Sequence, residues 1–497
     1  MTDRIPSFFG GQHQGSTSWL ERENPARPSS VVGAVGEVDA ASAAAAVDAA
    51  DAAFIPWSQR PLEERVELLL AATSAVLEDR EQLAVLLTRE LGKVLTDTRG
   101  EIGFTDLFVR YCASVAEDVT RPTEIDDEKG RLSIIRQPYG VIGAITPWNA
   151  PVILTSLKVA PALITGNTIV VKPSPLAPLA VTRQLAAMAE LLPPGVLNVV
   201  NGGAEVGEVL TTHPAIRKVA FTGGGATARH IMASASKGLK PLVLELGGND
   251  AAIFLPDAPI DADTIGRIIF GSFLTTGQVC MAAKRVYVHE SRYDEFLDRY
   301  LEVAAELLVT GDPEDPATTV GPLVSAGQRD RVQGLIDDAR SRGGTVHELG
   351  TVADPELFAH GYFMRPTLVT GLDDAAPLVR EEQFGPTVPL LTYRDEDEVV
   401  ARANDDALGL ASSVWSADED RAFAVAARIR SGYTFINSHN RSGLTLRAPF
   451  GGFRGSGFGK EFGREGAAEY LQSHTIHLPA GMRAGASAGR GNAYPGQ

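Results

Sequence analysis

The sequence of 497 residues predicts an α/β protein that contains two doubly wound α/β domains in series. Apolar runs of strand length recur along the chain, and segments of helix length separate the first five, as in a parallel sheet that helices cover on both faces. Hydrophobic residues make up 44% and charged residues 22%, which is the composition of a globular protein. The length suffices for two large domains, or for about three domains at roughly 150 residues each.

The N-terminal part predicts mainly helices. The first thirty residues are polar and rich in turn formers. Residues 38–54 are rich in alanine and predict a helix. A second helix follows Pro61 and ends at Gly92, and a third, amphipathic helix covers roughly 97–117. Residues 121–131 are polar and predict a connection.

The remaining chain predicts strands at regular intervals. Residues 132–145 alternate and are rich in β-branched residues, which indicates a strand. The apolar runs of the predicted sheets are 141–145, 168–171, 196–200, 218–221, 242–246, 251–255, 286–290, 367–370, 387–393, 411–415 and 433–437. The glycine-rich residues 451–459 predict a loop. Residues 479–497 are small, polar and rich in glycine, and they predict a disordered tail.

Charge and cysteine content exclude several classes of protein. Lys plus Arg is 45 and Asp plus Glu is 62, so the formal net charge is −17, which disfavours nucleic-acid partners and anionic membrane surfaces. No apolar run reaches the length of a membrane span. The only cysteines, Cys112 and Cys280, form no disulfide framework, so we expect a cytoplasmic protein. No cysteine pair or HExxH pattern predicts a metal site.

A glycine-rich turn follows the run 218–221. Gly223, Gly225 and Ala228 fit the pattern G-x-G-x-x-G/A, which lets a backbone approach a pyrophosphate at a helix N-terminus. A plain connection between a strand and a helix would carry the same residues. The acid that normally follows this pattern by about 20 residues would be Glu245, but its position at a Gly-Gly turn favours another role.

Three polar residues stand at the ends of predicted elements. Glu245 ends an apolar strand before two glycines, where open α/β sheets place their ligands. Cys280 lies in a turn after an apolar helix and is a candidate nucleophile, whereas Cys112 lies within a helix and is expected to be buried and inert. Asn149 follows the strand 141–145, and its amide could hold an oxyanion. The alternatives are a solvated acid, a buried thiol and an ordinary turn.

In combination these segments carry a resemblance. The matching motifs are TPWN at 146–149, VKPS at 171–174, FTG at 221–223, LELGG at 244–248, GQVC at 277–280, EEQFGP at 381–386 and PFGG at 449–452. In their order and spacing they are similar to those of the aldehyde dehydrogenase superfamily along nearly the whole chain, with benzaldehyde- and vanillin-type members as the nearest guess. The resemblance implies a Rossmann-like cofactor domain, a catalytic domain and a small β oligomerisation element.

The resemblance also implies catalytic roles. The Cys280 thiolate would attack an aldehyde carbonyl, and the Asn149 side chain and the Cys280 backbone N–H would hold the resulting oxyanion. Loss of hydride would leave a thioester, and Glu245 would activate the water that hydrolyses it. Lys158 and Glu461 resemble the family's proton-relay pair.

The implied cofactor is NAD or NADP. By resemblance, the cofactor-binding residues are Ile145, Thr146, Pro147, Trp148, Lys172, Ser174, Pro175, Gly203, Phe221, Thr222, Gly223, Gly224, Leu246, Glu382 and Phe384. Members that prefer NAD usually carry a glutamate at the position of Pro175, and its absence predicts that NADP is accepted alongside NAD. Gly224 and Ala228 also depart from the family, which commonly has serine and glycine there.

The predicted organisation follows from the same resemblance. Residues 1–118 and 141–249 would form the NAD(P)-binding domain, and 250–450 the catalytic domain. Residues 119–140 and 466–478 would supply oligomerisation strands, so a homodimer or homotetramer is expected.

The substrate would be a small-molecule aldehyde. The resemblance places Arg110, Tyr111, Phe273, Val279, Met281, Arg441 and Arg447 near it. The apolar and aromatic members of this set favour an aromatic aldehyde such as benzaldehyde. Converging arginines would instead favour a carboxylated semialdehyde, unless they form surface ion pairs. Alternatives from other classes are a cysteine hydrolase with a histidine base and a non-catalytic binding protein on the same fold.

Overall fold

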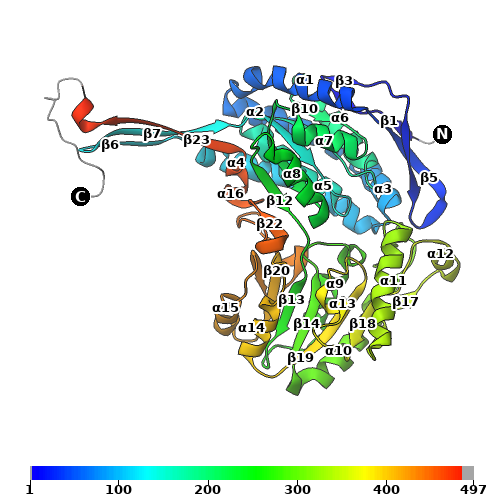
Figure 1. Ribbon diagram of the computed structural model, residues 1–497. Helices are drawn as coiled ribbons and strands as arrows, with labels where there is room; N and C mark the ends of the chain where they lie inside the picture. Colours follow the sequence, from blue (N-terminus) through cyan, green and yellow to red (C-terminus); the bar gives the residue numbers. More distant parts are fainter. Residues whose placement is uncertain (1–2, 484–497) are drawn as a thin grey trace.

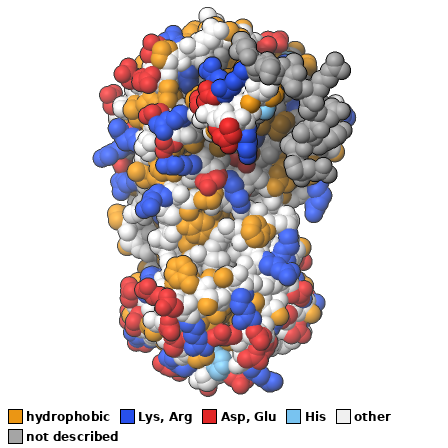
Figure 2. All heavy atoms as spheres, turned by 90° about the vertical axis from the view of Figure 1, so that its left-hand side faces the viewer, with side chains coloured by type: hydrophobic (Ala, Val, Ile, Leu, Met, Phe, Trp, Pro, Cys, Tyr) orange, Lys and Arg blue, Asp and Glu red, His pale blue; other side chains and the backbone are white. Residues whose placement is uncertain are grey.

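The computed structural model describes residues 3–483. It consists of two α/β lobes, one above the other, with a narrow antiparallel arm that projects to one side (Figure 1). Each lobe is built on one large sheet, which confirms the predicted fold class. Acidic and basic side chains are mixed over both lobes on the face shown in Figure 2, and hydrophobic side chains gather near its middle. Among the described residues, no helix combines the length and the apolar character that a bilayer crossing requires.

The sheet of the first lobe has eight strands in the order β22-β12-β11-β8-β9-β10-β2-β3. Its parallel part consists of β8 (Val141–Ile145), β9 (Thr168–Lys172), β10 (Leu197–Val199), β11 (Ile216–Thr222) and β12 (Leu242–Glu245). Its helices are α1 (Ala40–Ser58), α5 (Pro151–Ile164), α6 (Leu179–Ala189), α7 (Ala204–Thr212) and α8 (Gly225–Ser236). The strand order reverses between β8 and β11, and the carboxyl ends at such a point form the ligand crevice of open α/β sheets.

The second lobe repeats this construction with seven strands in the order β16-β18-β19-β14-β13-β20-β21. Its strands are β13 (Asp250–Phe254), β14 (Ala283–His289), β16 (Thr345–Glu348), β18 (Thr367–Thr370), β19 (Thr387–Tyr393), β20 (Ala411–Trp415) and β21 (Tyr433–Ile436), and only β16 is antiparallel to its neighbour. Its helices are α9 (Ala262–Phe273), α10 (Tyr293–Leu307), α11 (Ala326–Ser341), α12 (Pro355–His360), α13 (Pro377–Arg380), α14 (Glu396–Asn404) and α15 (Glu419–Ala426). β15 (Val309–Thr310) and β17 (Thr351–Val352) form a separate pair.

The arm is a small antiparallel sheet in the order β23-β7-β6 (Figure 1). Its strands are β6 (Thr123–Asp127), β7 (Gly130–Pro138) and β23 (Leu471–Pro479), which follows α16 (Gly463–Ala468). The predicted tail therefore begins too early at residue 479, because Pro479 still pairs with Gly130 and Ala480–Met482 form a 3-10 turn. Residues 484–497 of that tail lie outside the described part of the chain.

The N-terminal segment contains strands that its polar sequence does not predict. These are β1 (Asp3–Ile5), β2 (Phe8–Phe9), β3 (Gln12–His13), β4 (Trp19–Asn24) and β5 (Arg27–Gly36). β2 and β3 extend the first sheet, and β1, β5 and β4 form a separate sheet. Edge strands tolerate polar residues because one side of each faces solvent.

Two other predicted elements are divided in the structure. The helix expected from Pro61 to Gly92 is α2 (Leu62–Glu78) and α3 (Arg80–Leu91), separated at Asp79, and α4 (Leu95–Thr120) follows. The strand expected at 132–145 is β7 and β8, which belong to different sheets and are separated at Gly140, where φ is 130°.

The residues predicted as a loop at 451–459 include a short strand, β22 (Gly457–Phe458). β22 pairs with β12, so that Gly457 lies opposite Glu245. The chain therefore returns from the second lobe to the first, and Figure 1 shows this orange segment between the two lobes.

Candidate active site

Cys280 lies just after an unusual turn. Thr275, Thr276 and Gly277 have φ of 53°, 58° and 71°, three successive left-handed residues. Such backbone is unfavourable for threonine and persists only where surrounding structure holds it. A Cβ on Gly277 would lie 2.3 Å from the carbonyl oxygen of Gly385, so the turn packs directly against another loop. The nucleophile candidate is therefore carried by a tightly held segment.

Cys280 lines a cavity of about 210 Å³ between the two lobes. The lining residues are Pro147, Trp148, Asn149, Thr222, Gly223, Gly224, Glu245, Leu246, Gly247, Cys280, Glu382 and Phe384. All of them except Gly247 are among the catalytic or cofactor residues that the sequence predicts. The structure thus brings the three candidate catalytic groups, an amide, a carboxylate and a thiol, to one space.

Asn149 is buried directly after β8, and its side chain is fixed on the nucleophile turn. Its Nδ2 donates a hydrogen bond of 3.0 Å to the carbonyl oxygen of Gln278. One amide hydrogen is thereby used, and the other remains for a ligand. Gln278 is itself anchored, because Val324 N donates 3.0 Å to its Oε1.

A buried ion pair supports the backbone of Asn149, and sequence analysis missed it. Lys93 Nζ donates to the carbonyl oxygen of Asn149 at 3.2 Å and pairs with Glu101. Glu101 Oε1 accepts from Val152 N at 2.9 Å, at the start of α5. The pair therefore holds the chain on both sides of the amide. No motif marks these residues, since an isolated lysine in a connection and a glutamate on a helix are usually solvated.

Glu245 ends β12 and is buried. Among the described residues its Oε1 has no hydrogen-bond partner. Burial raises the pKa of Glu245 well above its ordinary value, the Glu461 carboxylate raises it further, and Lys158 opposes the rise. A raised pKa suits a carboxyl group that takes and releases protons.

Lys158 and Glu461 are brought together, as the resemblance implies. Lys158 Nζ donates to Glu461 Oε1 at 2.7 Å and to Thr222 Oγ1 at 2.6 Å, and both charged side chains are buried. Because Thr222 lines the cavity, the pair lies directly behind its wall.

The two thiols differ in their surroundings. Cys280 retains partial exposure, and burial raises the pKa of its thiol to about 12, against the opposing effect of the Lys284 cation. Cys112 is buried within α4, and burial raises the pKa of its thiol further. Its predicted place in the core is confirmed.

The wall beside Cys280 is shaped for close approach of a flat ligand. A Cβ on Gly247 would lie 2.1 Å from Glu382 Oε2, and a Cβ on Gly223 would lie 2.5 Å from the Phe221 ring. Glu382 Oε1 accepts from Gly248 N at 3.2 Å. These glycine-lined surfaces, at the carboxyl ends of β11 and β12, fit a dinucleotide.

Phe384 and Trp148 form the aromatic part of the same wall. Their ring centroids are 5.4 Å apart and the rings are nearly perpendicular. Thr146 is buried and half-buried Ile145 ends β8, so the chain from β8 leads directly into this wall. An aromatic surface of this kind suits a planar ring.

The other cofactor candidates lie further along the same edge. Lys172 ends β9, and burial lowers its pKa to about 8, against the opposing charge of Glu37. Glu37 and Gly203 line a second cavity of about 590 Å³. Ser174 is half-buried and Pro175 is exposed.

The predicted substrate residues separate into two groups. Met281, Tyr111 and Cys280 pack against the same hydrophobic core, and Val279 is half-buried beside them. Phe273 does not line the Cys280 cavity, because it packs in the core of the second lobe and faces a separate groove of about 880 Å³.

None of the three predicted arginines lines the described Cys280 cavity. Arg110 is exposed and pairs with Asp106 at 2.7 Å, and Arg441 pairs with Asp97 at 3.0 Å. Arg447 is exposed near Tyr111, where burial raises the pKa of the Tyr111 hydroxyl and the Arg447 charge opposes that rise.

Comparison with known proteins agrees with this geometry. The model of the aldehyde dehydrogenase family matches residues 12–476. Among curated relatives, the chloroplastic betaine aldehyde dehydrogenase of Beta vulgaris is 37% identical over 421 residues, which cover 84% of this chain and 83% of that protein. The mitochondrial succinate-semialdehyde dehydrogenase of Arabidopsis thaliana is 36% identical over 437 residues, with 86% and 80% covered.

Solved structures agree as well. A putative aldehyde dehydrogenase from Burkholderia cenocepacia superposes with a TM-score of 0.91 at 36% identity, over 97% of this chain and 98% of that one. Betaine aldehyde dehydrogenase from Staphylococcus aureus, in complex with NAD+, gives a TM-score of 0.90 at 33% identity, with 95% and 94% covered. The chain therefore belongs to the aldehyde dehydrogenase family and is an NAD(P)-dependent oxidoreductase.

Proposed function

We propose that this protein oxidises an aldehyde to a carboxylic acid through a covalent intermediate on Cys280. The observation that carries the proposal is the single cavity that Cys280, Asn149 and Glu245 line together. The three groups come from segments far apart in the sequence, and their chemistry is complementary. An amide stabilises negative oxygen, a thiol forms an acyl intermediate and a carboxylate moves a proton.

In the first half-reaction Cys280 releases its proton to solvent, and the sulfur of the thiolate bonds to the carbonyl carbon. The oxygen then carries the negative charge of a thiohemiacetal, which the Asn149 amide and the Cys280 N–H stabilise. When bound, NAD or NADP supplies the acceptor for the hydride that leaves this carbon. A thioester on Cys280 remains.

In the second half-reaction Glu245 removes a proton from water, and the hydroxyl attacks the thioester carbon. The carbon–sulfur bond breaks, the acid leaves and the Cys280 thiolate is restored. Glu245 must then release its proton. The Lys158–Glu461 pair behind Thr222 is placed to carry it away, since Glu461 already interacts with the Glu245 carboxyl group.

For the substrate, the surroundings favour an apolar or aromatic aldehyde. Cys280 and Met281 pack against the same core as Phe104, Tyr111 and Leu444. Arg110 and Arg441 are paired with carboxylates of their own, which weakens the alternative of a carboxylated semialdehyde. A panel of benzaldehyde, succinate semialdehyde, betaine aldehyde and an aminoaldehyde distinguishes the classes, and a higher kcat/KM for any polar member would overturn the preference.

For the cofactor, the exposed Pro175 leaves no carboxylate at that position to repel a 2′-phosphate, so acceptance of NADP remains our proposal. Glu37 lies in the electrostatic neighbourhood of Lys172 and lines the cavity with Gly203. A carboxylate there repels a phosphate and can accept hydrogen bonds from ribose hydroxyls. With no carboxylate at Pro175 but one at Glu37, we expect both cofactors to be accepted and NAD to be preferred over NADP.

The division of the chain into domains and its assembly into an oligomer are also proposals. Residues 1–118 and 141–249 would form the cofactor domain, 250–450 the catalytic domain, and the arm a contact in a homodimer or homotetramer. Ile125, Ile476 and Leu478 of the arm are exposed, which favours such a contact. Cytoplasmic location remains a prediction from the two unpaired cysteines.

The test follows absorbance of reduced nicotinamide when the protein, a cofactor and an aldehyde are mixed. We expect aldehyde-dependent absorbance with wild type and with Cys112→Ala, and none with Cys280→Ala. Activity of the Cys280→Ala protein at the wild-type rate would refute the proposal. A cysteine hydrolase is less well supported, because no histidine is among the residues that line the described cavity.

A further inference from the structure

Lys284 lies four residues after Cys280 and curls back onto it. It stands on β14, and its side chain is almost fully buried. Its Nζ donates to the carbonyl oxygens of Val279 and Cys280, at 2.9 Å and 2.5 Å, and lies 3.4 Å from Glu382 Oε1. The three N–H donors of the ammonium group therefore have three acceptors.

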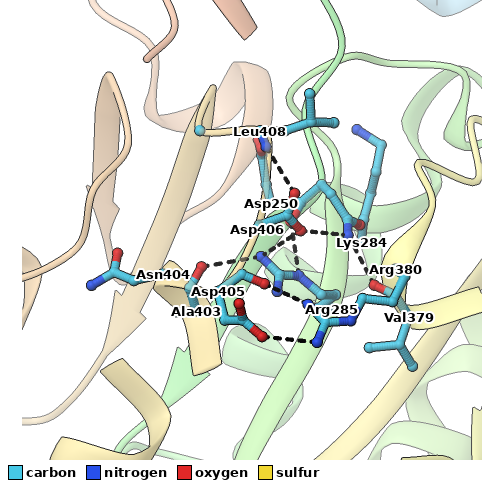
Figure 3. A network of polar contacts seen from close by, with 12 residues as sticks. Asp250, Lys284, Arg285, Val379, Arg380, Ala403, Asn404, Asp405, Asp406 and Leu408 are labelled. Carbon is cyan, nitrogen blue, oxygen red and sulfur yellow. Dashed lines mark hydrogen bonds and ion pairs between the residues drawn. The ribbon is translucent and has the colours of Figure 1, made fainter. Parts of the chain in front are cut away.

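Arg285, the next residue on β14, does not share the contacts that Lys284 makes with the nucleophile turn. Arg285 points to the other face of the sheet and lies 3.4 Å from Asp406, in a separate buried network with the backbone of Ala403. Figure 3 shows Arg285 within that network and the amino end of Lys284 extending away from it. Of these two basic residues, only Lys284 serves the nucleophile turn.

Of the three acceptors of Lys284, the Val279 carbonyl oxygen bears most directly on the proposed oxyanion site. The Val279 carbonyl and the Cys280 N–H belong to the same peptide group. A cation bound to that carbonyl draws electron density from the amide and strengthens the N–H as a donor. That N–H is one of the two donors that the proposed mechanism assigns to the oxyanion.

We infer that Lys284 is a positioning residue of the oxyanion site, which acts by holding and polarising the Val279–Cys280 peptide group. The inference rests on the proposed function of Cys280. Lys284 completes the support of this turn, because Asn149 already binds the preceding carbonyl, that of Gln278. Every backbone carbonyl from 278 to 280 is thus held by a side chain, which fixes the direction of the Cys280 N–H.

Two other effects of Lys284 must be separated from this one. Its positive charge favours the Cys280 thiolate. Its ion pair with Glu382 can order a cofactor residue. Alkylation of Cys280 by iodoacetamide reports the thiolate alone, and the KM for the cofactor reports Glu382. Hydrolysis of p-nitrophenyl acetate without cofactor reports both the thiolate and the oxyanion site.

The experiment compares wild type with Lys284→Met, Lys284→Arg and the control Lys218→Met. Lys218 is also buried and pairs with a carboxylate, Glu469 at 2.8 Å, but it does not line the Cys280 cavity. For Lys284→Met we expect esterase kcat and the burst of reduced nicotinamide to fall on the order of tenfold to a hundredfold. We expect alkylation to slow less than that, and Lys284→Arg to recover part of the loss. Lys218→Met should leave all three rates near wild type.

An esterase loss in Lys284→Met no larger than its alkylation loss would overturn the inference, as would an effect confined to the KM for the cofactor. If Lys284→Met does not fold, the comparison is made with Lys284→Arg, which keeps the charge but whose planar guanidinium cannot repeat all of the ammonium contacts. In that variant esterase activity should fall while alkylation does not, and an unchanged esterase rate would overturn the inference. Failure of the proposed function itself is distinguishable, because it would show as wild-type activity in Cys280→Ala.

Discussion

Lys158 on α5 donates a 2.7 Å hydrogen bond to Glu461, which lies 303 residues later in the chain. Both partners are buried, and both act on the pKa of Glu245 with opposite sign: Glu461 raises it and Lys158 lowers it. The pair thus adjusts the carboxyl group that the proposed mechanism uses as a base.

The first prediction concerns this adjustment. Glu245 must be deprotonated to activate water, so hydrolysis of the thioester rises with pH through the pKa of Glu245. Glu461→Gln removes a like charge and should move that rise to lower pH, whereas Lys158→Met removes an opposite charge and should move it to higher pH. The pH profile of thioester hydrolysis measures both, and a shift of both variants in the same direction would contradict the assignment.

A second prediction separates the two half-reactions. Glu245→Gln should keep a burst of reduced nicotinamide, since formation of the thioester does not need the base. Its steady-state turnover should fall by roughly 10² to 10⁴, the usual loss when a general base is removed. Stopped-flow absorbance gives both quantities from one trace. Loss of the burst along with turnover would place Glu245 in the first half-reaction instead.

A third prediction follows from the raised pKa of Cys280, which is about 12 in the protein without cofactor. Below that pH the thiolate fraction rises about tenfold per pH unit. The rate of alkylation by iodoacetamide should therefore climb without a plateau from pH 7 to pH 10, and Cys112→Ala should give the same curve. A plateau below pH 9 would show that the thiolate is better stabilised than this site indicates.

A fourth prediction tests the carboxylate beside Lys172. Glu37→Gln should raise kcat/KM for NADP relative to NAD by roughly 5- to 50-fold, because it removes the repulsion of a 2′-phosphate near the buried lysine. Glu205→Gln, which changes another acidic residue of the same cavity, is the matched control and should alter the ratio less. Equal ratios in wild type and Glu37→Gln would remove Glu37 from the cofactor site.

A fifth prediction uses the close approach at Gly247. Gly247→Ala places a methyl group 2.1 Å from the position that Glu382 Oε2 occupies, so Glu382 must move and the dissociation constant of the cofactor should rise by at least about tenfold. Gly334→Ala on α11 is the control, because a Cβ there meets nothing within 4 Å. It should leave binding unchanged and raise the free energy of unfolding by about 0.5–1 kcal/mol. Isothermal titration with NAD and thermal unfolding measure the two effects.

The central parallel strands of both large sheets were predictable because they are buried on both faces. Runs such as 168–171 and 251–255 are mostly apolar, and they fall on β9 and β13. β1 to β5 were missed because four of them are short or lie at a sheet edge, and because the segment that contains them is rich in polar residues and turn formers. The break at Asp79 carries neither glycine nor proline, so nothing in the local pattern marks it.

In the candidate active site, too, some residues could be predicted from the local sequence and others could not. Asn149, Glu245 and Cys280 each end or follow an element, and their motifs place them before any contact is known. Lys284 and Lys93 were not predicted, because a single lysine in a sequence indicates a solvated side chain. Their role depends on burial and on partners that only the tertiary structure supplies.

The pairing of β22 with β12 has a consequence for synthesis of the protein. The nucleophile, the amide and the base have all been synthesised by residue 280, but Glu461 reaches the first lobe only when the chain turns back through Gly457. Because ribosomes make the N-terminal part first, a nascent chain exposes its thiol before the group that completes the charge balance around Glu245 exists. A chain that stops before Gly457 would therefore lack both the strand that pairs with β12 beside Glu245 and the Glu461 carboxylate that raises the pKa of Glu245.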